Sequence, residues 1–109
     1  MKSLISESDW KYLRSIHDEM LHALCSRINN KAVDIVMREG KNPHEQYLEL
    51  YRHIKESDRV VADCFNDWRR SNIDIKIALL RRHRLLQDSH LAGLSDGARK
   101  WVAGLDEIG

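Results

Sequence analysis

The stretch YLELYRHIKESDRVVADCFNDW, residues 47–68, decides the fold of this chain. Its apolar residues recur at alternating steps of three and four, the spacing of one stripe along a helix that packs against another helix. The stripe consists of Tyr47, Leu50, Ile54, Val61, Cys64 and Trp68, with Ser57 as its polar member. The pattern therefore predicts a long helix with a continuous contact face.

This second predicted helix has a clear start and no strong stop. Asn42 can cap it, Pro43 fits its first position, and Glu45 lies in its first turn. We expect it to extend over residues 43–70, which is roughly 42 Å at about 1.5 Å per residue. A compact domain of this size has a diameter of about 34 Å. The helix would overhang its own chain, so we predict a homodimer in which a second copy covers the stripe.

The first predicted helix begins near Ser6. Ser6 and Asp9 have the spacing of a capping box, with Asp in place of Glu. The apolar stripe that follows contains Trp10, Leu13, Ile16, Met20, Leu24 and Ile28. Gly40 predicts the end of this helix. The two helices would form an antiparallel hairpin that turns near residue 41 and brings residue 17 or 18 opposite residue 64 or 65.

The region after residue 71 fits two patterns. Ile73, Ile75 and Ile77 alternate with polar residues as in a strand, but Ile73, Ile77 and Leu80 also fit a helix face. A lone strand would lack a pairing partner unless another chain supplied one, so we favour a helix over residues 72–84. A short helix near 88–92 and a last helix over 96–105, capped by Ser95, would follow. The predicted fold is a single all-α domain over residues 1–109, a long helical hairpin with short C-terminal helices, assembled as an elongated homodimer.

Composition indicates a folded protein outside the membrane. The chain is 42% hydrophobic and 32% charged, and its apolar runs are too short to span a bilayer. The N-terminal MKSLISESDW lacks the apolar core of a secretory signal. Cys25 and Cys64 lie within helical patterns, which favours free thiols in a reducing cytoplasm. We therefore expect a cytoplasmic location.

Two pairs of residues have the spacing of metal ligands. Glu19 and His22 form half of a di-iron motif, and Glu49 and His53 share a helix face. Neither pair has the further ligands that a complete site needs. We expect no metal and no cofactor.

Catalysis has weak support in the sequence. The hairpin register could bring His17 near Cys64, as in a thiol enzyme, and Asp63 and Asp67 could act as an acid–base pair. The spacing of these residues is not specific, and arginines nearby would neutralise the carboxylates. We expect a protein that is not an enzyme.

The end of the second helix has the composition of a protein interface. Trp68 and Phe65 would serve as anchors, and nearby arginines would select an acidic patch on a partner. The surface expected to contact a partner or a second copy comprises Leu50, Tyr51, Arg52, Ile54, Asp58, Arg59, Val61, Phe65, Asp67, Trp68, Arg69 and Arg70.

A basic band over residues 69–84 supports an alternative function. It holds six basic residues and one acidic residue, although the whole chain has a net charge of only +1. Clustered cations attract phosphates, so the band could make the protein a dimeric nucleic-acid-binding regulator. Isoleucines within the band are poor readers of bases, and we prefer a protein partner.

The C-terminal half also resembles a known family. The resemblance covers the stretch LYRHIKESDRVVADCFNDWRRSNIDIKIALLRRHRLLQDSHLAGLS, which begins at Leu50. It is carried by Leu50, Ile54, Val61, Phe65, Asp67, Arg69, Ser71, Leu80, Leu85, Gln87, Leu91 and Leu94. The chain thereby resembles the fluorescence recovery protein of cyanobacteria and its fluorescence recovery protein-like relatives.

This resemblance implies a role in photoprotection without chemistry or a cofactor. Members of the family are elongated all-helical homodimers that bind the C-terminal domain of the orange carotenoid protein and speed its return from the red to the orange resting state. Their partner surface carries Trp, His, Asp and Arg on the second helix. The corresponding positions here hold Leu48, Tyr51, Arg52 and Asp58, or Glu49, Arg52, His53 and Arg59 in a register shifted by one.

Overall fold

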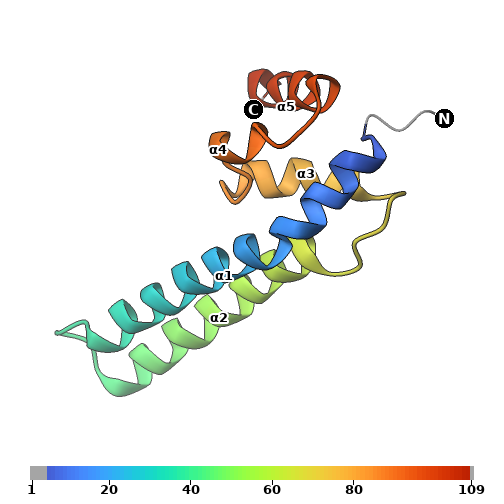
Figure 1. The fold of residues 1–109 in the computed structure, drawn as a ribbon. Coiled ribbons are helices and arrows are strands. Elements are labelled where there is room, and N and C mark those ends of the chain that lie inside the picture. Colours follow the sequence, from blue (N-terminus) through green and yellow to red (C-terminus); the bar gives the residue numbers. More distant parts are fainter. Residues whose placement is uncertain (1–4, 109) are drawn as a thin grey trace.

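The computed structural model describes residues 5–108, and they form five helices and no strand. The helices are α1 (Glu7–Met37), α2 (Pro43–Phe65), α3 (Ile73–Arg82), α4 (Asp88–Leu91) and α5 (Asp96–Ile108). Helices α1 and α2 form a long antiparallel hairpin, and α3, α4 and α5 gather at its open end (Figure 1). The all-α prediction is confirmed, and the ambiguous segment after residue 72 is a helix.

The predicted helix starts are present in atomic detail. The N–H of Asp9 donates to Ser6 Oγ, and the N–H of Ser6 donates to Asp9 Oδ2, both at 3.1 Å. The N–H of Glu45 donates to Asn42 Oδ1 at 2.8 Å, and Pro43 occupies the first turn. Gly40, at a φ of 88°, turns the chain between the two helices. Each cap satisfies a backbone donor that the start of a helix leaves unpaired.

Helix α2 is shorter than the sequence predicted, which corrects the argument from its length. It has 23 residues and ends at Phe65, so it spans roughly 35 Å rather than 42 Å. Helix α1, with 31 residues, is the longest element. The overhang of α2 alone therefore does not require a second chain.

A tight loop ends α2. Asn66 is extended, and Asp67 adopts a left-handed conformation with a φ of 61°, which Asp tolerates better than most residues. The indole N–H of Trp68 folds back and donates to the carbonyl of Cys64 at 2.7 Å. The side chain of Asn72 then donates to the carbonyl of Asp67 at 2.7 Å. Trp68 keeps the spacing of the helical stripe although it lies outside the helix.

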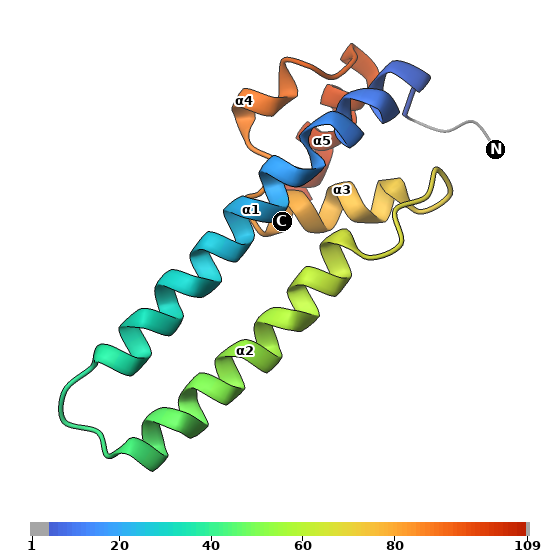
Figure 2. The same cartoon turned by 60° about the horizontal axis from the view of Figure 1, so that its bottom comes forward.

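The hydrophobic core lies at the open end of the hairpin. Its buried members are Ile5, Leu13, Met20, Leu24, Cys64, Phe65, Ile73, Ile77, Leu80, Leu85, Leu86, Leu94, Ala98 and Val102. The closed end of the hairpin extends away from α3, α4 and α5 (Figure 2). The described chain measures 54 × 25 × 24 Å, and its radius of gyration is 16.9 Å. A compact domain of this size would have about 13 Å, so a single chain is already elongated.

One arginine fastens the C-terminal helices to α3. The guanidinium of Arg81 binds both carboxylate oxygens of Asp106 at 2.9 and 2.8 Å. It also donates to Asp88 at 2.6 Å and to the carbonyl of Leu86 at 3.0 Å. The hydrogen bonds that Arg81 donates to Asp106, and then to Asp88, raise the pKa of Arg81, and Arg81 in turn lowers the pKa of Asp106. The fork-shaped guanidinium suits this convergence of acceptors, which an ammonium would match poorly.

The end of α3 is a Schellman turn with arginine at the position where glycine is usual. The N–H of Arg84 donates to the carbonyl of Arg81 at 3.0 Å, and the N–H of Leu85 donates to that of Leu80 at 2.8 Å. Arg84 has a φ of 57°. Arg27 of α1 donates to the carbonyl of Arg84 at 2.8 Å and so holds this turn against the hairpin.

Candidate protein-interaction surfaces

The protruding end of the hairpin carries most of the large apolar side chains that face solvent. We call this set the arm surface: Val33, Val36 and Met37 of α1 with Tyr47, Leu48, Tyr51 and Ile54 of α2. Their exposed fractions range from 41% for Leu48 to 73% for Met37. Tyr47, Tyr51 and Ile54 lie on one stripe of α2, because they are spaced four and three residues apart. An apolar stripe exposed on a structured helix is typical of a surface that contacts another protein.

Polar contacts join the two helices of this protruding arm. The Nε2–H of His53 donates to the carbonyl of Ile28 at 2.9 Å, and its Nδ1 accepts from Ser57 at 3.3 Å. Gln46 donates to the carbonyl of Arg38 at 2.9 Å. Ile35 is the buried apolar residue of this part of the hairpin, 1% exposed. The arm thus has both polar contacts and a buried isoleucine between its helices, and further large apolar groups on its outer surface.

The turn of the hairpin is held by charges. Glu49 accepts from Lys41 at 2.6 Å and from Arg38 at 2.9 Å. The hydrogen bond from Lys41 is the main cause that lowers the pKa of Glu49. Glu49 and His53 have the spacing of a metal-ligand pair, but each is engaged elsewhere: Glu49 with Lys41 and Arg38, and His53 with Ile28 and Ser57.

The structure spreads the predicted partner residues over three environments. The exposed members are Tyr51, Arg52, Ile54, Asp58, Arg59, Asp67, Arg69 and Arg70. The half-buried members are Leu50, Val61 and Trp68, and Phe65 is buried. Phe65, which we expected to be an anchor, packs within the chain's own core and meets the ring of His17 edge-on, with centroids 5.3 Å apart. The contact confirms the predicted hairpin register. The same stripe thus serves the monomer core at its C-terminal end and faces solvent at its N-terminal end.

A second surface lies at the opposite end of the hairpin. It is a hollow of about 380 Å³, lined by Trp10, Arg14, His17, Asp18 and Trp68. The His17 ring stands edge-on to Trp68, with centroids 4.6 Å apart. The guanidinium of Arg14 lies 5.9 Å from the centre of the Trp10 ring. Sequence reasoning missed this hollow, because Trp10 and Trp68 come from segments far apart in the chain.

The charges around Trp68 pair differently from the expectation. Arg69 pairs with Asp67 at 2.9 Å, as expected, but Arg70 pairs with Glu7 at the start of α1. Asp63 forms no ion pair with any residue from 5 to 108; its backbone carbonyl accepts from Lys76 at 2.7 Å. The end of α2 is therefore tied to both α1 and α3.

The basic band is largely occupied by contacts within the chain. Arg69, Arg70 and Arg81 form ion pairs, and Lys76 binds a backbone carbonyl. The remaining two cations, Arg82 and Arg84, have no carboxylate partner in the described part of the chain.

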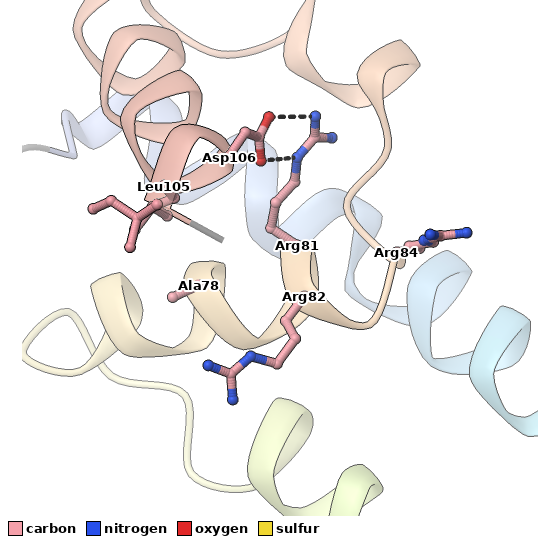
Figure 3. A pocket seen from close by; sticks show the side chains of 7 residues that line it. Ala78, Arg81, Arg82, Arg84, Leu105 and Asp106 are labelled. Atoms are coloured by element: carbon pink, nitrogen blue, oxygen red, sulfur yellow. Dashed lines mark hydrogen bonds and ion pairs between the residues drawn. The ribbon is translucent and has the colours of Figure 1, made fainter.

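Arg82 and Arg84 do not form a converging site for an anion. They line a hollow of about 390 Å³ between α3 and α5, together with Ala78, Arg81, Leu105, Asp106 and Ile108. Figure 3 shows their guanidiniums pointing to different sides, while Arg81 is already bound to Asp106. This arrangement gives the nucleic-acid alternative little support.

Metal binding and thiol catalysis gain no support from the geometry. Across residues 5–108, no three His, Cys, Asp or Glu side chains are grouped to hold a metal ion. Glu19 binds His90 at 2.5 Å rather than joining His22 in a metal site. Cys64 is fully buried, and burial, followed by the charge of Asp63, raises the pKa of its thiol. A raised pKa disfavours the thiolate that a nucleophile needs.

No known protein family, curated protein or solved structure matches this chain. Within the described helices, none is both long and apolar enough to cross a bilayer.

Proposed function

We propose that this protein is a non-enzymatic, dimeric regulator that acts by binding another protein. The observation that carries the proposal is the arm surface, which exposes seven large apolar side chains on a hairpin that extends beyond its own core. These side chains would stay in contact with water on an isolated hairpin. A second protein surface against the arm would remove the exposed apolar area from water.

The first occupant that we propose for the arm is a second copy of the chain. Tyr47, Tyr51 and Ile54 expose two aromatic rings and one aliphatic side chain on one stripe. Aromatic residues are enriched at interfaces, and a two-fold axis would bring the same stripe of two copies together. We place the dimer in the cytoplasm, where the free thiols of Cys25 and Cys64 would stay reduced.

The partner is proposed from the family resemblance. The orange carotenoid protein's C-terminal domain, or another protein with an acidic patch, would contact exposed residues of α2 such as Tyr51, Arg52 and Asp58. Compared position by position, they differ from the family's partner surface: Leu48, Tyr51, Arg52 and Asp58 stand where the family has Trp, His, Asp and Arg. A regulator of this kind shifts its partner's conformational equilibrium only if it binds one conformation more tightly than the other.

The dimer is tested by size-exclusion chromatography with light scattering. We expect the wild-type protein to have twice the 12.8 kDa mass of the chain. The double variant Tyr51→Glu/Ile54→Glu should shift the mass toward the monomer, because it places charges on the arm surface. Ser26→Glu/Asn30→Glu is the matched control, since it adds two glutamates one turn apart at exposed polar positions of α1. A wild-type mass of 12.8 kDa at high concentration would refute the dimer.

The partner is tested by the absorbance of purified orange carotenoid protein as it returns from red to orange in the dark. We expect the wild-type protein to accelerate this return and Arg52→Glu to reduce the acceleration. An unchanged rate, with a dimer confirmed by light scattering, would exclude this partner while leaving the binding function intact.

A further inference from the structure

Trp68, on one side of the hollow, is held by contacts within the chain itself. Trp68 is fixed by its hydrogen bond to the carbonyl of Cys64, by stacking on Phe65 with centroids 6.3 Å apart, and by the edge of His17. Both tryptophans are half-buried, so each presents part of its ring to solvent. A binding surface of ordered aromatic rings loses little side-chain freedom on association, which favours affinity.

The charges around the hollow define what it can accept. Arg14 and Arg70 both lie 5.9 Å from the centre of the Trp10 ring. The cation that such a ring attracts is therefore supplied by the protein itself, which disfavours an ammonium ligand. Arg70 is paired with Glu7, whereas Arg14 forms no ion pair with any residue from 5 to 108. Arg14 is thus the cation at this hollow that is available to an incoming carboxylate.

The remaining charged residue at the rim, Asp18, already has a hydrogen-bond partner. Nδ1 of His17 donates to Asp18 at 2.9 Å, so this carboxylate is directed toward the imidazole beside it. Asp18 still contributes a negative charge that weakens the attraction of any acidic ligand. The lining therefore combines two half-buried tryptophan rings, one available guanidinium and one opposing carboxylate.

We propose that this hollow is a recognition site for a protein segment in which Asp or Glu lies next to a bulky apolar residue. The carboxylate would bind Arg14 through a charge-assisted hydrogen bond, and the apolar side chain would lie against Trp10 and Trp68. This inference rests on the proposed protein-binding function and adds a second contact, at the opposite end of the hairpin from the arm surface.

The probe is the peptide acetyl-Glu-Leu-Phe-amide, titrated into the full chain while the indole N–H signals are followed by NMR. The chain has three tryptophans, so Trp101, which does not line the hollow, is an internal reference. We expect the signals of Trp10 and Trp68 to move and that of Trp101 to stay. The matched peptide acetyl-Lys-Leu-Phe-amide should leave all three unchanged.

Two substitutions should change the affinity for the acidic peptide in opposite directions. Arg14→Gln should weaken binding roughly five- to tenfold, because it removes the charge that holds the carboxylate. Asp18→Asn should strengthen it roughly two- to fivefold, because it removes the opposing charge. A merely structural role for both residues would not produce opposite signs.

The site would be refuted by equal shifts with the lysine peptide, by an unchanged affinity in Arg14→Gln, or by the absence of any shift in Trp10 and Trp68. These results would leave the dimer and the arm surface untouched, because light scattering tests them separately.

Discussion

The carboxylate of Asp9 binds both the backbone N–H and the hydroxyl of Ser95, 86 residues later in the chain, at 2.7 Å each. Asp9 also completes the capping box at the start of α1. Ser95 in turn accepts from the N–H of Ala98 in the first turn of α5 at 3.3 Å. One buried carboxylate, 1% exposed, thus joins the N-terminal ends of two helices, whose partial positive charges favour an anion.

Asp9 should make stability depend on acidity. Burial raises its pKa, but the hydrogen bonds from Ser95 and Ser6 outweigh burial and lower the pKa below its usual range. A lowered folded-state pKa means that the stabilisation is complete above about pH 4 and is lost as the pH falls further. We expect Asp9→Asn to reduce the free energy of unfolding at pH 7 by about 1–3 kcal/mol.

Urea unfolding at a series of pH values checks this. The difference between wild type and Asp9→Asn should shrink below pH 4. Asp96→Asn, which removes an exposed carboxylate, is the control and should change stability by less than about 0.5 kcal/mol. A difference of the same size at all pH values would contradict the role assigned to Asp9.

Gly93 should tolerate no side chain. A Cβ at this position would overlap the ring of Tyr12. We expect Gly93→Ala to lower the free energy of unfolding by about 1–3 kcal/mol, measured by urea denaturation. The loss should be smaller in a Tyr12→Ala background. Gly104→Ala, where a Cβ meets nothing within 4 Å inside α5, should instead stabilise by about 0.5–1 kcal/mol.

Glycine in place of Arg84 should stabilise the folded protein. Its left-handed backbone closes the turn after α3, and its side chain forms no ion pair with residues 5–108. We expect Arg84→Gly to raise the free energy of unfolding by about 0.5–1 kcal/mol. Arg82→Gly, which places glycine in the last turn of α3, should lower it by a similar amount in the same thermal or urea melts. Equal signs for the two variants would show that backbone strain at Arg84 is not the cause.

Cys64 should be unreactive in the folded protein. Burial raises the pKa of its thiol above the usual range, so little thiolate forms at pH 8 and little reagent reaches it. In a Cys25→Ala protein, we expect a chromogenic disulfide reagent to titrate no thiol within minutes. The same protein in urea should react fully. Rapid reaction without urea would revive the thiol-enzyme hypothesis.

Local signals in the sequence were sufficient to predict the helix starts. Ser6 with Asp9, Asn42 with Pro43, and Ser95 each act on backbone groups within a few residues, so their effect does not depend on distant parts of the chain. The helix between residues 73 and 82 was favoured because a lone strand would lack a pairing partner, and the hairpin register at His17 followed from the position of the turn near residue 41.

The end of α2 and the hollow at Trp68 were out of reach for a physical reason. Trp68 contacts its own helix through the carbonyl of Cys64, so it keeps helical spacing in a segment that has left the helix. The turn depends on a left-handed Asp67 and on the side chain of Asn72, neither of which interrupts an apolar pattern. The hollow also needs Trp10, which only the folded hairpin brings near.

The one-sided core also sets how different parts of the molecule will exchange their amide hydrogens with solvent. Amides near the buried cluster can exchange only when the whole domain opens, whereas those near Ile35 and His53 are protected by little more than the hairpin itself. Amides at the C-terminal end of α1 and the start of α2 would therefore exchange first. A protein bound to the arm surface would slow exchange there more than elsewhere.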